Sequence, residues 1–191
     1  KSKMKIMDKR LDRITNDQLR DVPCDPEGLK DYISELNESL KNTTDIKTQV
    51  RLLGEMGVHL RSLLDLESAK SKLVLALKII QDNQLGLKLE VQQKIRLAHA
   101  LQWQGLYDES NILFQKIIAA CRTDDSARIY LDFALQHSGK NLFEQKRYSE
   151  ALSQFEEAMD LRVKRHAPAD QIESTQFAIA KTKYFTASNK S

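Results

Sequence analysis

Small and apolar side chains recur along this chain at intervals of 41 residues. Three positions define the pattern: a small residue, a bulky apolar residue four positions later, and a second small residue twelve positions earlier. They are occupied in turn by Ala69, Ser110 and Ala151, by Leu73, Phe114 and Phe155, and by Gly57, Ala98 and Gly139. Self-similarity at such a period is typical of stacked helical hairpins. The small residues would let paired helices approach closely, and the bulky residues would fill the space between hairpins.

The helical periodicity places three hairpins at residues 46–83, 87–122 and 126–166, followed by a last helix at 169–187 that caps the array. Ser126, after two aspartates, is a helix start signal, and Pro168 is a stop signal. The expected fold is all-α: a right-handed superhelical solenoid of antiparallel helix pairs with a capping C-terminal helix. This solenoid would occupy residues 46–187.

Residues 1–45 are expected to hold N-terminal helices that form either a cap or a degenerate repeat. Met4, Met7, Leu11 and Ile14 follow a 3-4-3 spacing, which predicts an amphipathic helix over residues 3–20. A second helix would follow Asp25, a good N-cap residue. For the helix at 3–20 the sequence leaves three roles open: capping the first hairpin, binding a partner or a second copy, and lying on a membrane surface.

Charge is distributed unevenly along the 191 residues. The formal net charge is +3, and residues 1–20 carry seven Lys or Arg against three Asp. The remaining residues are therefore nearly balanced, which argues against a basic nucleic-acid footprint over the whole protein. The sequence also has no apolar run approaching the roughly 20 residues of a membrane-spanning helix.

Candidate reactive residues are sparse. Cys24 and Cys121 stand outside any CxxC or Cys/His cluster, as expected of free thiols in the cytoplasm. His99 and His137 are the nearest approach to a metal site, but no carboxylate or thiol accompanies them. No catalytic motif or phosphate-binding glycine loop is present. We therefore expect no enzyme activity, no cofactor and no metal. Whether a leader once preceded Lys1 is left open.

Two stretches resemble the tetratricopeptide-repeat family: LAHALQWQGLYDESNILFQKII at residues 97–118 and GKNLFEQKRYSEALSQFEEAM at residues 139–159. The resemblance extends over roughly residues 46–187. The usual unit is about 34 residues long. The longer unit here is similar to the extended repeats of kinesin light chains and of Gram-positive response-regulator-binding proteins. The resemblance implies a non-catalytic scaffold or adaptor whose first helices line a concave groove for peptides or partner helices.

Mapped onto this chain, the implied groove is cationic and carries interleaved aromatic residues. Its candidate residues are Arg51, Arg61, Arg96, His99, Gln102, Trp103, Phe133, His137, Lys140, Phe143 and Lys181. Such a surface suits an acidic protein or peptide with apolar anchors. The alternative is that the aromatic residues simply pack neighbouring helices. The Lys and Asn clamp by which family members hold chaperone tails is not present.

Two other functions remain open at this level. The basic segment at residues 1–20 would suit a nucleic-acid-associated regulatory module, although nucleic acid is not the expected partner. An uncapped end of the array would suit self-assembly. The sequence does not set the oligomeric state or name the partner.

Overall fold

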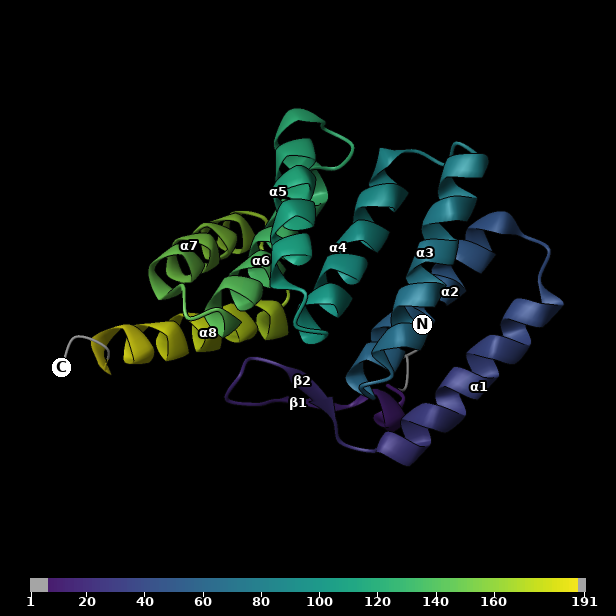
Figure 1. Cartoon of the computed structure of the whole chain (residues 1–191), viewed down its shortest axis with the longest axis horizontal. Helices are drawn as coiled ribbons and strands as arrows, with labels where there is room; N and C mark the ends of the chain where they lie inside the picture. Colours follow the sequence, from purple (N-terminus) through teal and green to yellow (C-terminus); the bar gives the residue numbers. More distant parts are fainter. Residues whose placement is uncertain (1–6, 189–191) are drawn as a thin grey trace, which may run out of the picture.

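The computed structural model describes residues 7–188, which form a row of helices stacked side by side (Figure 1). The helices are α1 (Pro26–Asn42), α2 (Ile46–Ser62), α3 (Leu66–Asp82), α4 (Leu87–Trp103), α5 (Tyr107–Thr123), α6 (Leu131–Glu144), α7 (Tyr148–Lys164) and α8 (Ala169–Ser188). The described residues also form two short 3-10 turns. The first, η1 (Lys9–Leu11), precedes the β-hairpin described below, and the second, η2 (Arg128–Tyr130), precedes α6. Helices α2 with α3, α4 with α5, and α6 with α7 form the antiparallel pairs. The all-α solenoid is confirmed. Within residues 7–188, no helix combines the length and apolar character needed to cross a membrane.

Helix starts and turns follow local chemistry. The side chains of Asp25 and Asp45 accept hydrogen bonds from the backbone N–H groups of Gly28 and Thr48, which caps α1 and α2. Each pair turns through a left-handed residue at the same repeat position: Leu64, Gly105 and Lys146, with φ of 64°, 78° and 60°. Only the middle turn has the glycine that this conformation favours.

The small and bulky positions meet inside each hairpin. A Cβ atom added to Gly57 would lie 2.6 Å from Cγ of Leu73, and one added to Gly139 would lie 2.6 Å from Cε1 of Phe155. The bulky side chain of the second helix therefore lies directly on the glycine of the first. Phe114 also joins a core that includes residues of α6, so the bulky residues fill space within hairpins as well as between them.

The predicted helix at residues 3–20 is wrong for the residues that the structure describes; Met4 lies outside them. Strands β1 (Arg13–Thr15) and β2 (Asp21–Pro23) form an antiparallel hairpin in which Ile14 is opposite Val22. The Asn16 side chain accepts the N–H groups of both Gln18 and Arg20 and so closes the turn. Ile14, part of the predicted apolar stripe, is 63% exposed. The apolar side chain that the hairpin buries is that of Leu19, at the turn.

Only one of the helices predicted for residues 1–45 therefore forms within the described part. This helix, α1, packs on α2 through Leu36, Leu52 and Met56, so it takes the place of the second helix of a pair. No α-helix precedes α1 within the described residues. The η1 turn is tied to α1 by an ion pair of 2.8 Å between Arg10 Nη1 and Glu35 Oε1.

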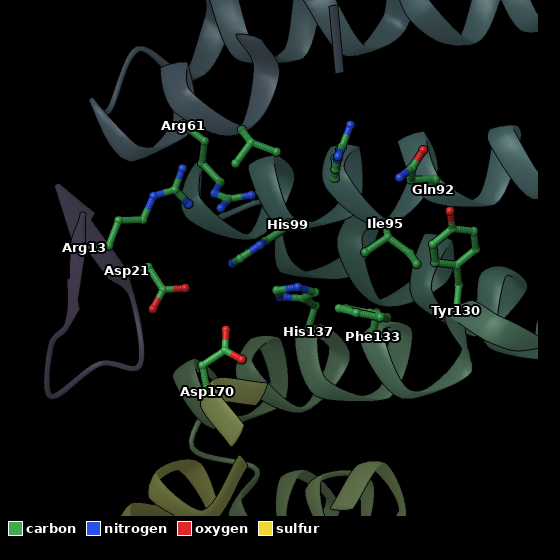
Figure 2. A pocket seen from close by; sticks show the side chains of 12 residues that line it. Arg13, Asp21, Arg61, Gln92, Ile95, His99, Tyr130, Phe133, His137 and Asp170 are labelled. Carbon is green, nitrogen blue, oxygen red and sulfur yellow. The ribbon is translucent and has the colours of Figure 1, made fainter. Parts of the chain in front are cut away.

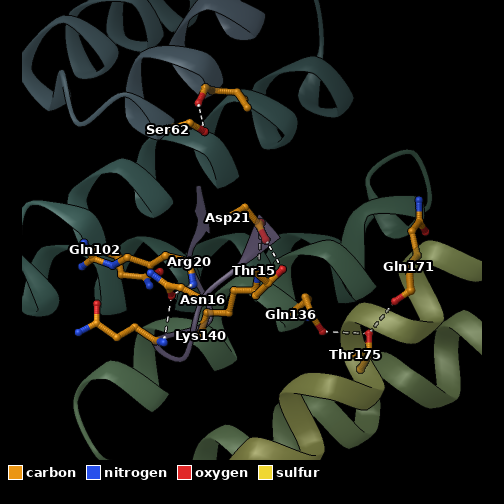
Figure 3. Close-up of polar contacts among 12 residues, drawn as sticks. Thr15, Asn16, Arg20, Asp21, Ser62, Gln102, Gln136, Lys140, Gln171 and Thr175 are labelled. Carbon is orange, nitrogen blue, oxygen red and sulfur yellow. Dashed lines mark hydrogen bonds and ion pairs between the residues drawn. The ribbon is translucent and has the colours of Figure 1, made fainter. Parts of the chain in front are cut away.

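At the other end, α8 is fastened to the last pair by a buried arginine. Arg162 forms a 2.9 Å ion pair with Asp132 of α6 and donates to Oγ1 of Thr175 on α8 at 2.7 Å. Thr175 Oγ1 also lies within hydrogen-bonding distance of the Gln136 side chain and the Gln171 carbonyl (Figure 3). Helix α8 thereby covers the end of the α6–α7 pair.

Candidate binding groove

The N-terminal hairpin lies along the face formed by the first helices of the pairs and by α8. Arg13 of β1 donates from Nη2 to Nδ1 of His59 on α2 at 2.8 Å. Arg20 forms an ion pair of 2.7 Å with Glu144 of α6. Asp17 in the turn accepts from Lys181 of α8 at 2.5 Å. The hairpin thus links α2, α6 and α8 across the predicted groove.

Leu19 anchors the hairpin in this face. Its side chain is only 1% exposed and packs with Leu142, Phe143 and Ala178. Burial of a leucine in this way is worth roughly 1.5–3 kcal/mol. Leu19 adopts φ of 61°, a conformation that non-glycine residues seldom take.

The hairpin also supplies a half-buried carboxylate. Asp21 accepts from Thr15 Oγ1 at 2.7 Å and from Lys140 Nζ at 3.3 Å (Figure 3). Burial disfavours the charge of Asp21, but Lys140 and Thr15 outweigh it and lower the pKa of Asp21. With Asp17 and Leu19, the hairpin therefore presents acidic groups around an apolar anchor, which is the chemistry predicted for a ligand of this groove.

Trp103 and Glu144 connect the hairpin to the neighbouring helices. The guanidinium carbons of Arg20 and Arg61 lie 4.9 and 5.2 Å from the centroid of the Trp103 ring, which is 5% exposed. Glu144 accepts from Arg20 and, at 3.1 Å, from Nε2 of Gln102. These contacts hold α4, α6 and the hairpin together.

Beside the hairpin the groove stays open as a cavity of about 510 Å³. Figure 2 shows Arg13, Arg61, Asp21 and Asp170 towards one side of it and Ile95, Tyr130 and Phe133 towards the other. The residues that line it are Arg13, Asp21, Val58, Arg61, Gln92, Ile95, Arg96, His99, Tyr130, Phe133, His137 and Asp170. The apolar wall is formed by Ile95, Tyr130 and Phe133. The pocket thus combines a charged end with an apolar surface.

Burial governs the protonation of the groups around this pocket. Burial, with help from Arg13, lowers the pKa of Arg61 to about 9, so its guanidinium stays charged at neutral pH. Burial also lowers the pKa of His99 and of His137 well below the usual value, and their rings lie 4.3 Å apart. Both imidazoles are therefore neutral at pH 7. Among residues 7–188 no group of three His, Cys, Asp or Glu side chains is arranged as a metal site.

Comparison with known proteins agrees with this architecture. Residues 139–168 match the tetratricopeptide-repeat family. Residues 139–168 are thus a tetratricopeptide repeat, set within a fold of stacked helical pairs. Its fold is similar to that of PlcR from Bacillus thuringiensis, whose crystal structure is a complex with the peptide PapR7 and DNA. That similarity has a TM-score of 0.63 at 16% identity and spans 86% of this chain and 66% of PlcR. No curated protein matches the sequence significantly.

The repeat groove brings together five of the predicted residues at the open pocket: Arg61, Arg96, His99, Phe133 and His137. Gln102 and Trp103 are buried and do not line the pocket. Gln102 donates to Glu144, and the Trp103 ring contacts Arg20 and Arg61.

Four other predicted residues are engaged elsewhere. Lys140 and Lys181 pair with aspartates of the hairpin. Phe143 is a packing residue, in contact with the rings of Tyr148 and Phe185. Arg51 does not join the pocket; it is exposed and pairs with Glu55 at 3.4 Å.

Arg13, Asp21, Gln92, Tyr130 and Asp170 also line the pocket and were not predicted from the sequence. The first two come from the hairpin, whose turn signal, Asn16 followed by Asp17, was available in the sequence. Tyr130 and Asp170 lie at the starts of helices, where the repeat pattern gives no information on which side chains face the groove.

Proposed function

We propose that this protein is a non-catalytic binding module that captures an acidic peptide segment carrying an apolar side chain. The observation that supports this is the open pocket itself, in which arginines stand opposite a wall of Ile95, Tyr130 and Phe133. Arginine suits carboxylate recognition because its guanidinium donates two parallel hydrogen bonds. An apolar pocket of a few hundred Å³ suits an anchor side chain of the same ligand.

Two further facts are compatible with this role. The structural neighbour PlcR is described in complex with a peptide. Cys24 is exposed and Cys121 buried, and both are free thiols, which agrees with a reducing compartment such as the cytoplasm.

The test is selection from a displayed library of random heptapeptides, followed by fluorescence polarisation with the enriched peptides. We expect enrichment of Asp or Glu beside an apolar residue. Arg96→Glu should weaken binding about 10–100-fold, the equivalent of a lost charge-assisted hydrogen bond. Lys116→Glu, on the exposed surface of α5, is the matched control and should bind as the wild type does. Absence of enrichment, or equal affinity of the two variants, would contradict the proposal.

Nucleic-acid binding through residues 1–20 stays a prediction without a supporting contact. Arg10, Arg13 and Arg20 are already engaged within the protein, by Glu35, His59 and Glu144 respectively. Filter binding against salt tests it: a steep loss of affinity with salt would revive the prediction.

A further inference from the structure

Three arginines from three separate elements line the open pocket without a carboxylate partner. Arg13 comes from β1, Arg61 from the end of α2 and Arg96 from α4. Within residues 7–188, no carboxylate oxygen lies within 4.0 Å of any of the three guanidinium groups. Arg96 makes a 3.2 Å hydrogen bond to Gln93 Oε1, and Arg13 bonds to His59, but neither contact neutralises charge.

The carboxylates nearest to the arginines do not balance them. Asp21 is engaged by Lys140 and Thr15. Glu55 accepts from Tyr32 and pairs with Arg51. Asp170, the remaining carboxylate of the lining, is exposed at the rim. The pocket therefore carries unmatched positive charge.

Arg61 shows that this charge is not a by-product of packing. Its side chain is 4% exposed, and its Nε has no hydrogen-bond partner. A buried charge without a partner destabilises a fold, and an apolar residue of similar size would be more favourable there. The contact with Trp103 offsets part of this penalty. Within the pocket, Nε2 of the buried His99 also lacks a partner. Unsatisfied buried polar groups that line a cavity are the groups that a ligand would satisfy.

We propose that Arg13, Arg61 and Arg96 form an oxyanion-binding site that the N-terminal hairpin and the solenoid build together. The ligand group is a carboxylate or a phosphate, either of which can accept from several guanidinium donors at once. This inference rests on the proposed function in one respect: the molecule that carries the carboxylate or phosphate is taken to be the captured peptide. Because Arg13 belongs to the hairpin, anion binding and hairpin docking strengthen each other by the same factor.

The chain offers a direct optical probe, since Trp103 is its single tryptophan and lies against Arg61. Citrate and pyrophosphate are titrated separately at constant ionic strength, with chloride as the reference, while Trp103 fluorescence and the melting temperature are recorded. We expect a saturable change and a rise in melting temperature with at least one of the two. The anion that binds identifies the carboxylate or the phosphate as the preferred group. No saturable response to either anion overturns the site.

Variants separate the site from a structural role. Arg61→Met should weaken anion binding at least tenfold while its melting temperature without anion equals or exceeds that of the wild type. Asp170→Asn removes a repulsive charge at the rim and should tighten binding severalfold, the opposite sign. A lowered melting temperature of Arg61→Met together with unchanged anion affinity would make Arg61 a packing residue.

The contribution of the hairpin is tested in the full chain with Arg13→Met and Leu19→Ala, both of which should weaken anion binding. If Leu19→Ala strengthens it, the hairpin competes with the ligand and the joint site is wrong. The two proposals also fail separately. Enriched peptides whose binding is insensitive to Arg61→Met and to pyrophosphate would leave the peptide function standing without the anion site. Saturable anion binding without peptide enrichment would leave the anion site standing without the peptide function.

Discussion

Removing the anchor of the N-terminal hairpin should release the hairpin while the solenoid stays folded. Leu19 is the buried apolar side chain of the hairpin, since Ile14 and Val22 are exposed. Replacing a fully buried leucine by alanine costs about 2–5 kcal/mol. The Asp17–Lys181 pair contributes far less, because Asp17 is 86% exposed in its side chain and exposed pairs are worth about 0.2–1 kcal/mol. A two-stranded hairpin is marginally stable alone, so losing the apolar part of its docking contacts should be enough to free it.

The assay is hydrogen exchange of the amides at residues 13–22, with Trp103 fluorescence as a second readout because Arg20 would leave the indole ring. Leu19→Ala should bring these amides close to unprotected exchange, while the helical circular dichroism is unchanged. Ile14→Ala is the control on the same hairpin and should leave the exchange unaltered. The reasoning is refuted if Asp17→Asn frees the hairpin more than Leu19→Ala does, or if Leu19→Ala exchanges as the wild type.

Three further predictions concern the solenoid. Gly139→Ala should destabilise the protein by up to about 2 kcal/mol in urea unfolding, because overpacking against Phe155 costs about 1–3 kcal/mol and the better helix former returns about 1; an unchanged midpoint would contradict the packing. Lys146→Gly should stabilise it by about 0.5–1 kcal/mol, since glycine relieves the left-handed turn at a smaller cost in chain entropy; a lower midpoint would contradict this. Because the folded pKa of His99 is lowered, stability is complete above about pH 6.5 and falls below it, by at most about 1.4 kcal/mol per pH unit for this residue; His99→Gln should flatten that slope in urea unfolding measured against pH.

The helical pairs could be predicted because their determinants are local and repeated. Apolar residues on the buried face of a helix recur every three to four positions. Three copies of one unit also reveal which positions are small and which are bulky. Gly57 and Gly139 illustrate the point, since each lies under the bulky residue found sixteen positions later. The register could be predicted because the three copies agree, and a single helix offers no such comparison.

The N-terminal segment could not be predicted in this way because distant partners decide its structure. Its strands have three residues each, too few to show a period. Arg20 binds Glu144, which lies 124 residues further along the chain. The stripe of Met7, Leu11 and Ile14 favoured a helix, but burial of Leu19 and the ion pairs of the hairpin outweigh that preference.

The sequence could predict that the first helices form a groove. It could not predict which part of the groove the hairpin fills and which part stays open. Position 58 and its equivalents, His99 and Lys140, were expected to face inwards from the family resemblance mapped onto the repeat. No sequence pattern indicated that the hairpin would engage Lys140 and leave His99 at an open pocket. That division depends on where a short segment docks, and docking is decided by three-dimensional contacts between parts of the chain that share no period.

The division has a physical consequence for ligand binding. Asp17, Leu19 and Asp21 satisfy the lysines and the apolar surface of one part of the groove, while the arginines of the other part stay unmatched. A ligand that displaced the hairpin would have to replace the burial of Leu19 and the Arg20–Glu144 pair before gaining any affinity. A ligand that enters the open pocket meets no such cost and gains Arg13 as a donor. The energetics therefore favour binding beside the docked hairpin over binding in its place.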